Sequence, residues 1–102
     1  MNDLFTTYTR EPIHTVQMTV DNFAKVANYL AVEWANDIDR RVTDVDAVLG
    51  EVHMEHGSDE DDDVYILKLG RYLVLDRTEP SGIKVVTDSQ FRILTALYSK
   101  AK

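Results

Sequence analysis

The sequence has 102 residues, of which 44% are hydrophobic and 28% are charged, as expected for one ordinary folded domain. It contains no cysteine, which excludes disulfides, thiolate metal sites and cysteine nucleophiles. The 18 acidic and 11 basic residues give a formal net charge of −7, which opposes binding to nucleic acid or to anionic membranes by bulk electrostatics. We therefore expect any charged partner to be basic, although an acidic composition also serves solubility alone.

Targeting signals are not apparent in the sequence. No stretch reaches the ~18 apolar residues that a membrane-spanning helix requires. Residues 1–10 lack the basic start and the continuous apolar run of a signal peptide. We predict a cytoplasmic protein with no membrane partner.

The first half of the sequence predicts an arm, a strand and a helix. Residues 1–11 show no clear periodicity and are interpreted as an N-terminal arm of uncertain order. Residues 13–19 alternate between apolar and polar side chains, which predicts a strand. From Asp21, with Thr19 or Asp21 as the cap, apolar residues recur at helical spacing and predict a helix that lies on a sheet. Its apolar stripe consists of Phe23, Val26, Ala27, Leu30, Ala31 and Trp34.

The middle of the sequence is less regular. Residues 36–46 are rich in Asp and Arg, and they fit either a loop with a short edge strand or a helical turn. Residues 48–56 alternate and predict a strand. One face of this strand is expected to carry Val52 and Met54, and the other Glu51, His53 and Glu55.

The last part of the sequence predicts three strands and a second helix. Residues 64–69 and 72–76 form two apolar strands joined at Gly70, and a turn at residues 79–82 leads to a third strand over 83–86. The T-x-x-Q sequence at residues 87–90 is typical of a capping box at the start of a helix. The apolar ridge of this helix consists of Phe91, Ile93, Leu94, Leu97 and Tyr98.

These elements predict an α+β fold in the order β-α-β-β-β-β-α. We expect a mostly antiparallel sheet with two helices packed on it, and a single domain spanning residues 1–102. Five consecutive acids follow Ser58 and belong in a solvated loop because they repel one another. Residues 58–63 are therefore predicted to form an acidic loop, either a solubilising feature or a docking site for a basic partner. The candidate partner-binding residues are Asp59, Glu60, Asp61, Asp62 and Asp63.

For every candidate catalytic motif, a structural role explains the same residues better than a catalytic one. Glu51, His53 and Glu55 on one strand face could hold a divalent metal in principle, but no second ligand cluster has a definite spacing. The acidic run lacks the spaced ligands and the central glycine of an EF-hand. Neither a nucleophile elbow nor a glycine-rich phosphate loop occurs. We expect no enzyme, no cofactor and no metal, and we interpret Trp34, Tyr72 and Phe91 as core residues.

The N-terminal part carries a pattern of turn, strand and helix residues. Tyr8–Thr19 reads Y-T-R-E-P-I-H-T-V-Q-M-T, and Asp21–Asn22 and Val26–Ala27 follow it. The pattern has a Tyr-Arg pair near a proline, a strand that ends in a Val-Gln-x-Thr-like tetrapeptide, and a helix entered through Asp-Asn.

The C-terminal part carries a second pattern in the same order. Leu69–Asp76 reads L-G-R-Y-L-V-L-D, and Ile83–Phe91 leads on to Tyr98. Together the two stretches cover about half of the sequence. They resemble a family of small proteins encoded by bacteriophages and prophages, many from actinobacterial and other Gram-positive hosts and largely without assigned function.

The resemblance implies the architecture and a viral origin, and it carries over no catalytic residue. Arg71 stands where the family usually has Asp, and the acidic residues 58–63 are not part of the family pattern. Both departures fall near one hairpin, so a binding partner shared with the family does not follow from the resemblance.

The leading hypothesis is a phage-encoded accessory protein that acts in the cytoplasm of a bacterial host. It would bind a host or phage protein without contacting nucleic acid directly. Whether it also forms a homodimer is left open by the sequence. One alternative is a DNA mimic whose acids imitate phosphates and occupy a nucleic-acid-binding protein. The least favoured alternative is a small metal-dependent enzyme that uses the Glu51, His53 and Glu55 face.

Overall fold

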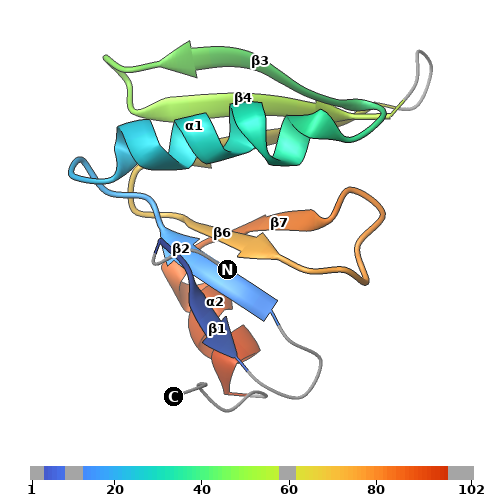
Figure 1. The fold of residues 1–102 in the computed structure, drawn as a ribbon. Helices are drawn as coiled ribbons and strands as arrows, with labels where there is room; N and C mark the ends of the chain where they lie inside the picture. The colour runs from blue at the N-terminus through green and yellow to red at the C-terminus, as the bar shows by residue number, and fades with distance from the viewer. Residues whose placement is uncertain (1–3, 9–12, 58–61, 97–102) are drawn as a thin grey trace. The chain divides into compact units, whose positions relative to one another are not determined.

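The structure is a computed structural model that describes residues 4–8, 13–57 and 62–96 (Figure 1). The chain divides into two compact units. Unit 1 combines Met1–Gln17 with Gly70–Lys102, and unit 2 is the intervening stretch Met18–Leu69. Each unit has its own antiparallel sheet and its own α-helix.

Unit 1 is built on a four-stranded antiparallel sheet with the order β1-β2-β6-β7. Its strands are β1 (Thr6–Tyr8), β2 (Ile13–Gln17), β6 (Tyr72–Leu75) and β7 (Ile83–Val86). The early and late parts of the sequence meet where β2 pairs with β6, which sets Val16 opposite Leu73. Leu73, Val74 and Ile83 are fully buried, so β6 and β7, the two strands from the late part of the sequence, supply much of the apolar interior.

The helix of unit 1, α2 (Asp88–Thr95), begins as the sequence predicts. The Thr87 hydroxyl accepts a hydrogen bond from the Gln90 amide at 3.3 Å, and the Gln90 side chain accepts one from the Thr87 amide at 2.9 Å. This reciprocal capping box confirms the predicted helix start. Among its described residues α2 has no fully buried side chain, and Phe91 and Leu94 are half-buried.

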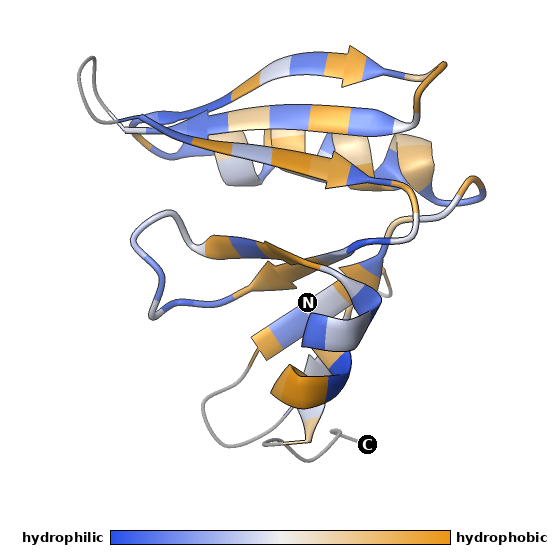
Figure 2. Ribbon diagram, turned by 180° about the vertical axis from the view of Figure 1, so that it is seen from behind, coloured by the Kyte–Doolittle hydropathy of each residue, from blue (hydrophilic) through white to orange (hydrophobic). Residues whose placement is uncertain are grey.

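Unit 2 packs one helix against a three-stranded antiparallel sheet of order β3-β4-β5. Its elements are α1 (Phe23–Val32), the 3-10 turn η1 (Trp34–Asn36), β3 (Arg40–Asp46), β4 (Glu51–His56) and β5 (Asp63–Lys68). Figures 1 and 2, seen from opposite sides, show α1 lying across one face of this sheet. The buried side chains on helix and sheet are Val26, Ala27, Leu30, Trp34, Val52, Met54 and Leu67.

The start of α1 is organised by Thr19 and Asn22. The Thr19 hydroxyl accepts from the Asn22 amide at 3.3 Å, and the Asn22 side chain accepts from the Thr19 amide at 2.7 Å. These two bonds fix the loop that leads into the helix. The N-cap residue of α1 is Asn22, which makes no side-chain capping hydrogen bond, so the prediction that Thr19 or Asp21 caps this helix is wrong.

A β-bulge in β3 explains why this segment has no regular period. Its register shifts between Val42 and Asp44, so one extra residue stands in β3. As a result Val42 pairs with Met54 and Val45 pairs with Val52, although the two valines are three residues apart. A spacing of three is helical in a sequence, so the bulge conceals the strand.

The α+β class and both predicted helices are confirmed, whereas the strands differ in number and grouping from the expected arrangement. The strands form two sheets instead of one, and Thr6–Tyr8 from the N-terminal arm adds β1. The apolar runs on either side of Gly70 do not pair with each other, because β5 pairs with β4 and β6 pairs with β2 and β7. Gly70 adopts a φ of 88°, a conformation that favours glycine, at the boundary between the two units.

Candidate functional site

The sheet of unit 2 has one face opposite α1, which we call the outer face and which is seen in Figure 2. The strand register places side chains on it in three rows across β3, β4 and β5. The rows are Arg41, Glu55 and Val64; Asp44, His53 and Ile66; and Asp46, Glu51 and Lys68. On the other side of β4, Val52 and Met54 are fully buried, which confirms the two predicted faces of this strand.

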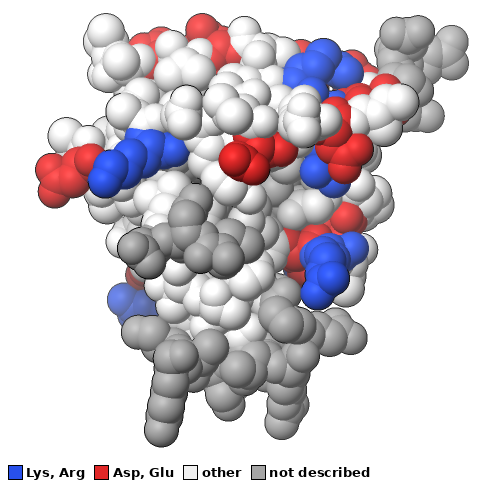
Figure 3. Space-filling view, in the orientation of Figure 1, with Lys and Arg blue, Asp and Glu red and all other residues white. Residues whose placement is uncertain are grey.

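Carboxylates dominate the charge of the outer face. The acids are Asp44, Asp46, Glu51 and Glu55, and the cations are Arg41 and Lys68. Neighbouring strands lie about 4.8 Å apart, so the backbones of Asp46 and Glu51, which pair across β3 and β4, lie within the ~8 Å screening length of physiological salt. Figure 3 views unit 2 from the α1 side and shows that acidic side chains, with basic ones between them, also follow the β3 edge. The face therefore presents a net negative surface to solvent.

The centre of the outer face is a hydrogen-bonded imidazole and carboxylate. His53 Nε2 lies 3.0 Å from Glu51 Oε1, and Lys68 Nζ lies 3.9 Å from Glu51 Oε2. Glu55, the third member of the predicted ligand face, lies 3.9 Å from Arg41 instead. In the described part of the chain no group of three or more His, Asp or Glu side chains is placed to hold a metal ion.

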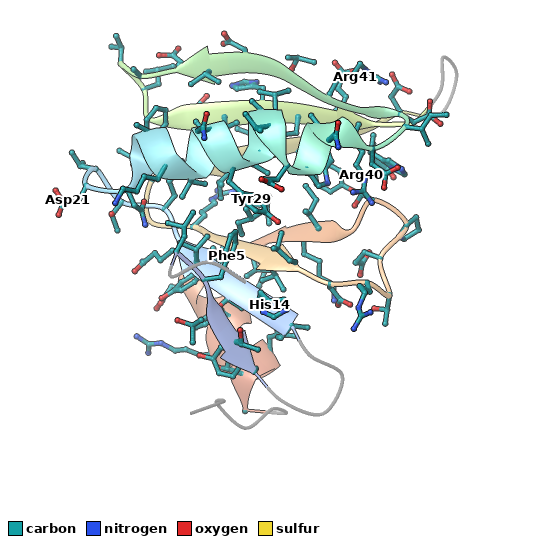
Figure 4. All side chains as sticks on the ribbon, in the orientation of Figure 1. Phe5, His14, Asp21, Tyr29, Arg40 and Arg41 are labelled. Atoms are coloured by element: carbon teal, nitrogen blue, oxygen red, sulfur yellow. The ribbon has the colours of Figure 1, made fainter. Side chains whose placement is uncertain are left out.

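The three histidines lie apart from one another. His14 (Figure 4) is in unit 1, where its Nδ1 lies 2.7 Å from the Thr7 hydroxyl. Burial lowers the pKa of His14, and the Arg77 guanidinium adds to this effect. His53 and His56 alternate on β4 and therefore point to opposite faces, as the sequence predicts.

Arg41 holds the two flanks of the acidic segment. Its Nη1 donates to the Gly57 carbonyl at 3.0 Å, and its Nη2 lies 3.0 Å from Asp62 Oδ2. Gly57 and Asp62 bracket residues 58–61, so one guanidinium fixes where the acidic segment leaves and rejoins the sheet. Figure 4 shows Arg40 and Arg41 at one end of unit 2 and Asp21 at the other.

The candidate partner-binding acids are only partly described. Asp59, Glu60 and Asp61 lie outside the described residues. Asp62 is half-buried through its pairing with Arg41, and its Oδ1 is buried without a hydrogen-bond partner. Asp63 is exposed but is already the first residue of β5, paired with His56. The last two acids are thus attached to the sheet rather than to a free loop.

Unit 1 contains a largely buried ion cluster at the β6–β7 turn. Asp76 is 7% exposed, and its Oδ1 accepts hydrogen bonds from the Thr78 amide at 2.9 Å and from the Thr78 hydroxyl at 2.7 Å. Lys84 Nζ lies 3.4 Å from Asp76 Oδ2 and 3.3 Å from a Glu79 carboxylate oxygen. Each charge here has a local partner, so this cluster holds the turn together and leaves no free ligand group.

Sequence reasoning missed Arg41, Asp44 and Asp46 as members of a charged face. The bulge displaces their alternation, so the only available signal was the high density of Asp and Arg in this segment. Their neighbours Glu51, His53 and Glu55 were found because β4 alternates without interruption.

Comparisons with protein-family models, with curated proteins and with solved structures find no match to this chain. Within residues 4–8, 13–57 and 62–96, no helix has the length and the apolar character needed to cross a membrane.

Proposed function

We propose that this protein is a non-enzymatic binding module, and that unit 2 binds a basic surface of another protein through its outer face and acidic segment 58–63. The observation that carries the proposal is the separation of charge between the units. Unit 2 contains 13 of the 18 acids and 4 of the 11 bases, a net charge of −9, whereas unit 1 has a net charge of +2.

Such crowding of like charge does not help unit 2 to fold. Self-repulsion within a compact unit lowers its stability, and surface ion pairs contribute only about 0–1 kcal/mol each. Arg41 and Lys68 compensate some carboxylates on the outer face, but Asp44 is exposed beside them. A negative surface of this kind raises the rate of association with a positive partner and disfavours negative ones.

The biological setting in this proposal follows the resemblance to phage and prophage proteins. A phage-encoded accessory protein acting in the host cytoplasm would meet many basic host proteins, among them those that bind nucleic acid. If the partner is of that class, unit 2 acts as the DNA mimic considered above, and duplex DNA will compete with it for the same site.

The test is the capture of binding proteins by the tagged chain from a bacterial lysate, followed by titration of the purified partner. One variant neutralises the outer face, with Asp44→Asn, Glu51→Gln and Glu55→Gln. The matched control removes the same amount of charge elsewhere, with Glu33→Gln, Asp37→Asn and Glu79→Gln.

We expect the outer-face variant to bind at least about tenfold more weakly at low salt, and the control to lose much less. The difference should shrink as salt shortens the screening length from about 10 Å at 0.1 M to about 3 Å at 1 M. Equal binding by the outer-face variant and the unaltered chain at every salt concentration would refute the proposal. Competition by duplex DNA would identify the DNA-mimic form of the function.

A further inference from the structure

One end of unit 2 is apolar, in contrast to its acidic outer face. A cavity of about 110 Å³ lies there, lined by Val20, Phe23, Ala47, Gly50 and Leu69. Three segments meet around it: the loop before α1, the β3–β4 turn and the residue that follows β5. All of them belong to unit 2. Figure 1 shows the loop before α1 and the β3–β4 turn at the same end of this unit.

The β3–β4 turn that borders the cavity is held by its own hydrogen bonds. Asp46 Oδ1 accepts from the Val48 amide at 3.0 Å and from the Leu49 amide at 2.9 Å, while the Gly50 amide donates to the Asp46 carbonyl at 2.8 Å. Gly50 adopts a φ of 69°, and a Cβ at this position would collide with the Leu69 side chain. Glycine therefore lets Leu69 close one side of the cavity.

The side chains around this end expose apolar surface although their backbone is ordered by the turn. Val20 is 80% exposed, Val48 95% and Leu49 64%. Figure 2 shows the β3–β4 turn and part of the loop before α1 in the colour of hydrophobic residues. Single exposed apolar residues are common on proteins, but a group of them around a cavity marks an interaction site.

The volume of the cavity and the charges near it together define which side chain could occupy it. An apolar cavity of about 150 Å³ holds a benzene molecule, so about 110 Å³ suits one aliphatic side chain. Three acids adjoin lining residues in the sequence, because Asp21 follows Val20, Asp46 precedes Ala47 and Glu51 follows Gly50, and they outnumber the bases Lys25 and Lys68 in the same segments. Lys68, beside Leu69, lies 3.9 Å from Glu51 and is thereby paired. An apolar side chain flanked by basic residues complements both features.

We propose that this cavity receives one aliphatic side chain from a short basic segment of the protein partner. The inference rests on the proposed function, because the basic flanks are recognised by the acidic surface of unit 2. The cavity adds a specific anchor to an attraction that charge alone would leave unspecific.

The test uses two labelled peptides and does not require the natural partner. One is a short peptide of Lys and Arg residues around a single central Leu, and the other has Ser in place of that Leu. Binding to the full chain is measured by fluorescence anisotropy at low salt. Two variants alter the cavity: Val20→Ser removes part of its wall, and Ala47→Leu fills it from an exposed position. Ile38→Ser is the matched control, because Ile38 is 81% exposed and does not line the cavity.

We expect the Leu peptide to bind about tenfold more tightly than the Ser peptide. Ala47→Leu should reduce this ratio to about one and Val20→Ser should reduce it severalfold, whereas Ile38→Ser should leave it unchanged. Thermal melts of all variants check that the fold is retained, and the amide resonances of Gly50 and Leu69 should shift with the Leu peptide alone.

The outcomes separate the two proposals. Equal binding of the Leu and Ser peptides, with both weakened by neutralisation of the outer face, overturns the anchor site and leaves the proposed function standing. Failure of both peptides to bind at low salt overturns the proposed function and the anchor site with it. A Leu preference that survives Ala47→Leu also overturns the assignment to this cavity.

Discussion

The two units each have one antiparallel sheet and one α-helix, but they differ in the sign and the size of their net charge. Unit 1 pairs its charges locally, as in the contacts of Lys84 with Asp76 and Glu79, and has a net charge of +2. Unit 2 has a net charge of −9, and its Arg41 pairs with Asp62 at the end of the acidic segment. This concentration of charge on one unit, which does not stabilise its fold, is the feature from which we propose a basic partner for unit 2.

The two units also differ in the side chains that hold their interiors together. Unit 1 adds to the buried aliphatic residues of its sheet a stack of Tyr72 on Phe91, with ring centroids 3.8 Å apart, and an edge contact of Phe91 with Tyr8. Unit 2 relies on fully buried aliphatic residues and on the buried Trp34, over which Arg40 lies 5.8 Å from the ring centroid. A substitution in the interior of one unit can therefore test the stability of that unit separately.

The largest effect is expected from Leu30→Asp in unit 2. Leu30 is fully buried in α1, so the variant loses a core side chain and buries an unpaired carboxylate. This costs roughly 3 to 5 kcal/mol or more, a large part of an ordinary total stability of ~5 to 15 kcal/mol. Circular-dichroism melts and amide spectra should show loss of the folded signals of unit 2. Ala31→Asp, at an exposed position of the same helix, is the control, and a cooperative melt of Leu30→Asp near the normal temperature would contradict the prediction.

The next effect is expected from Phe91→Ala in unit 1. The half-buried ring loses its stack on Tyr72 and its edge contact with Tyr8, at a cost of about 2 kcal/mol in the free energy of unfolding. Urea denaturation measures the loss. Ile93→Ala on the same helix should change stability by less than about 0.5 kcal/mol, because Ile93 is 72% exposed. Equal losses from the two variants would show that the stack contributes nothing.

Acid should weaken unit 1 through Asp76. Burial alone would raise the pKa of Asp76, but hydrogen bonds from Thr78 and Lys84 outweigh it and hold the pKa below the ordinary value of 3.8. The carboxylate therefore stabilises the fold above that value, and this contribution is lost as the pH falls from 3.8 through the folded-state pKa. Asp76→Asn should cost about 1 to 2 kcal/mol near neutral pH and should flatten the loss of stability below pH 3.8 in denaturant titrations. An unchanged acid profile in the variant would assign the loss to other carboxylates.

A smaller effect is expected from Arg41→Gln, compared with Arg92→Gln in unit 1. Arg41 donates to the Gly57 carbonyl and pairs with Asp62, so its loss should cost about 0.5 to 1 kcal/mol and speed amide exchange at Gly57. Arg92 is 80% exposed and makes only a helical pair with Asp88, so its replacement should change the melting temperature little. If both variants behave alike, Arg41 does not organise the acidic segment.

The smallest effect on stability, with a clear effect on binding, is expected from neutralising the acidic segment. Replacing Asp59, Glu60, Asp61, Asp62 and Asp63 by Ser and Asn takes the formal charge from −7 to −2. Stability should change by less than about 0.5 kcal/mol, because lost pairing of Asp62 is offset by reduced self-repulsion. Association with a basic partner should slow severalfold at low salt and recover relative to the unaltered chain at high salt. Unchanged kinetics would reduce the segment to a solubility feature.

Sequence reasoning predicted helices and strand faces best where the period of the apolar residues is uninterrupted. The buried positions Val26, Ala27 and Leu30 of the α1 stripe, the two faces of β4 and the capping box at Thr87 all depend on neighbours within one turn or one strand, whereas Ala31 of the same predicted stripe is exposed. It failed at β3, where the bulge near Val42 breaks the period of two, and at β1, which is only three residues long. Both misses concern strands that are defined by pairing rather than by their own composition.

The sequence by itself determined the α+β class, the start of α2 and the charge of the chain, because these follow from local spacing and from counting. Only the tertiary structure decided that the strands form two sheets, because strand pairing joins residues such as Val16 and Leu73 that lie far apart in the sequence. It also decided which charges share a surface. Arg41 and Asp62 meet because the register of β3, β4 and β5 places them together, and no local period encodes that register.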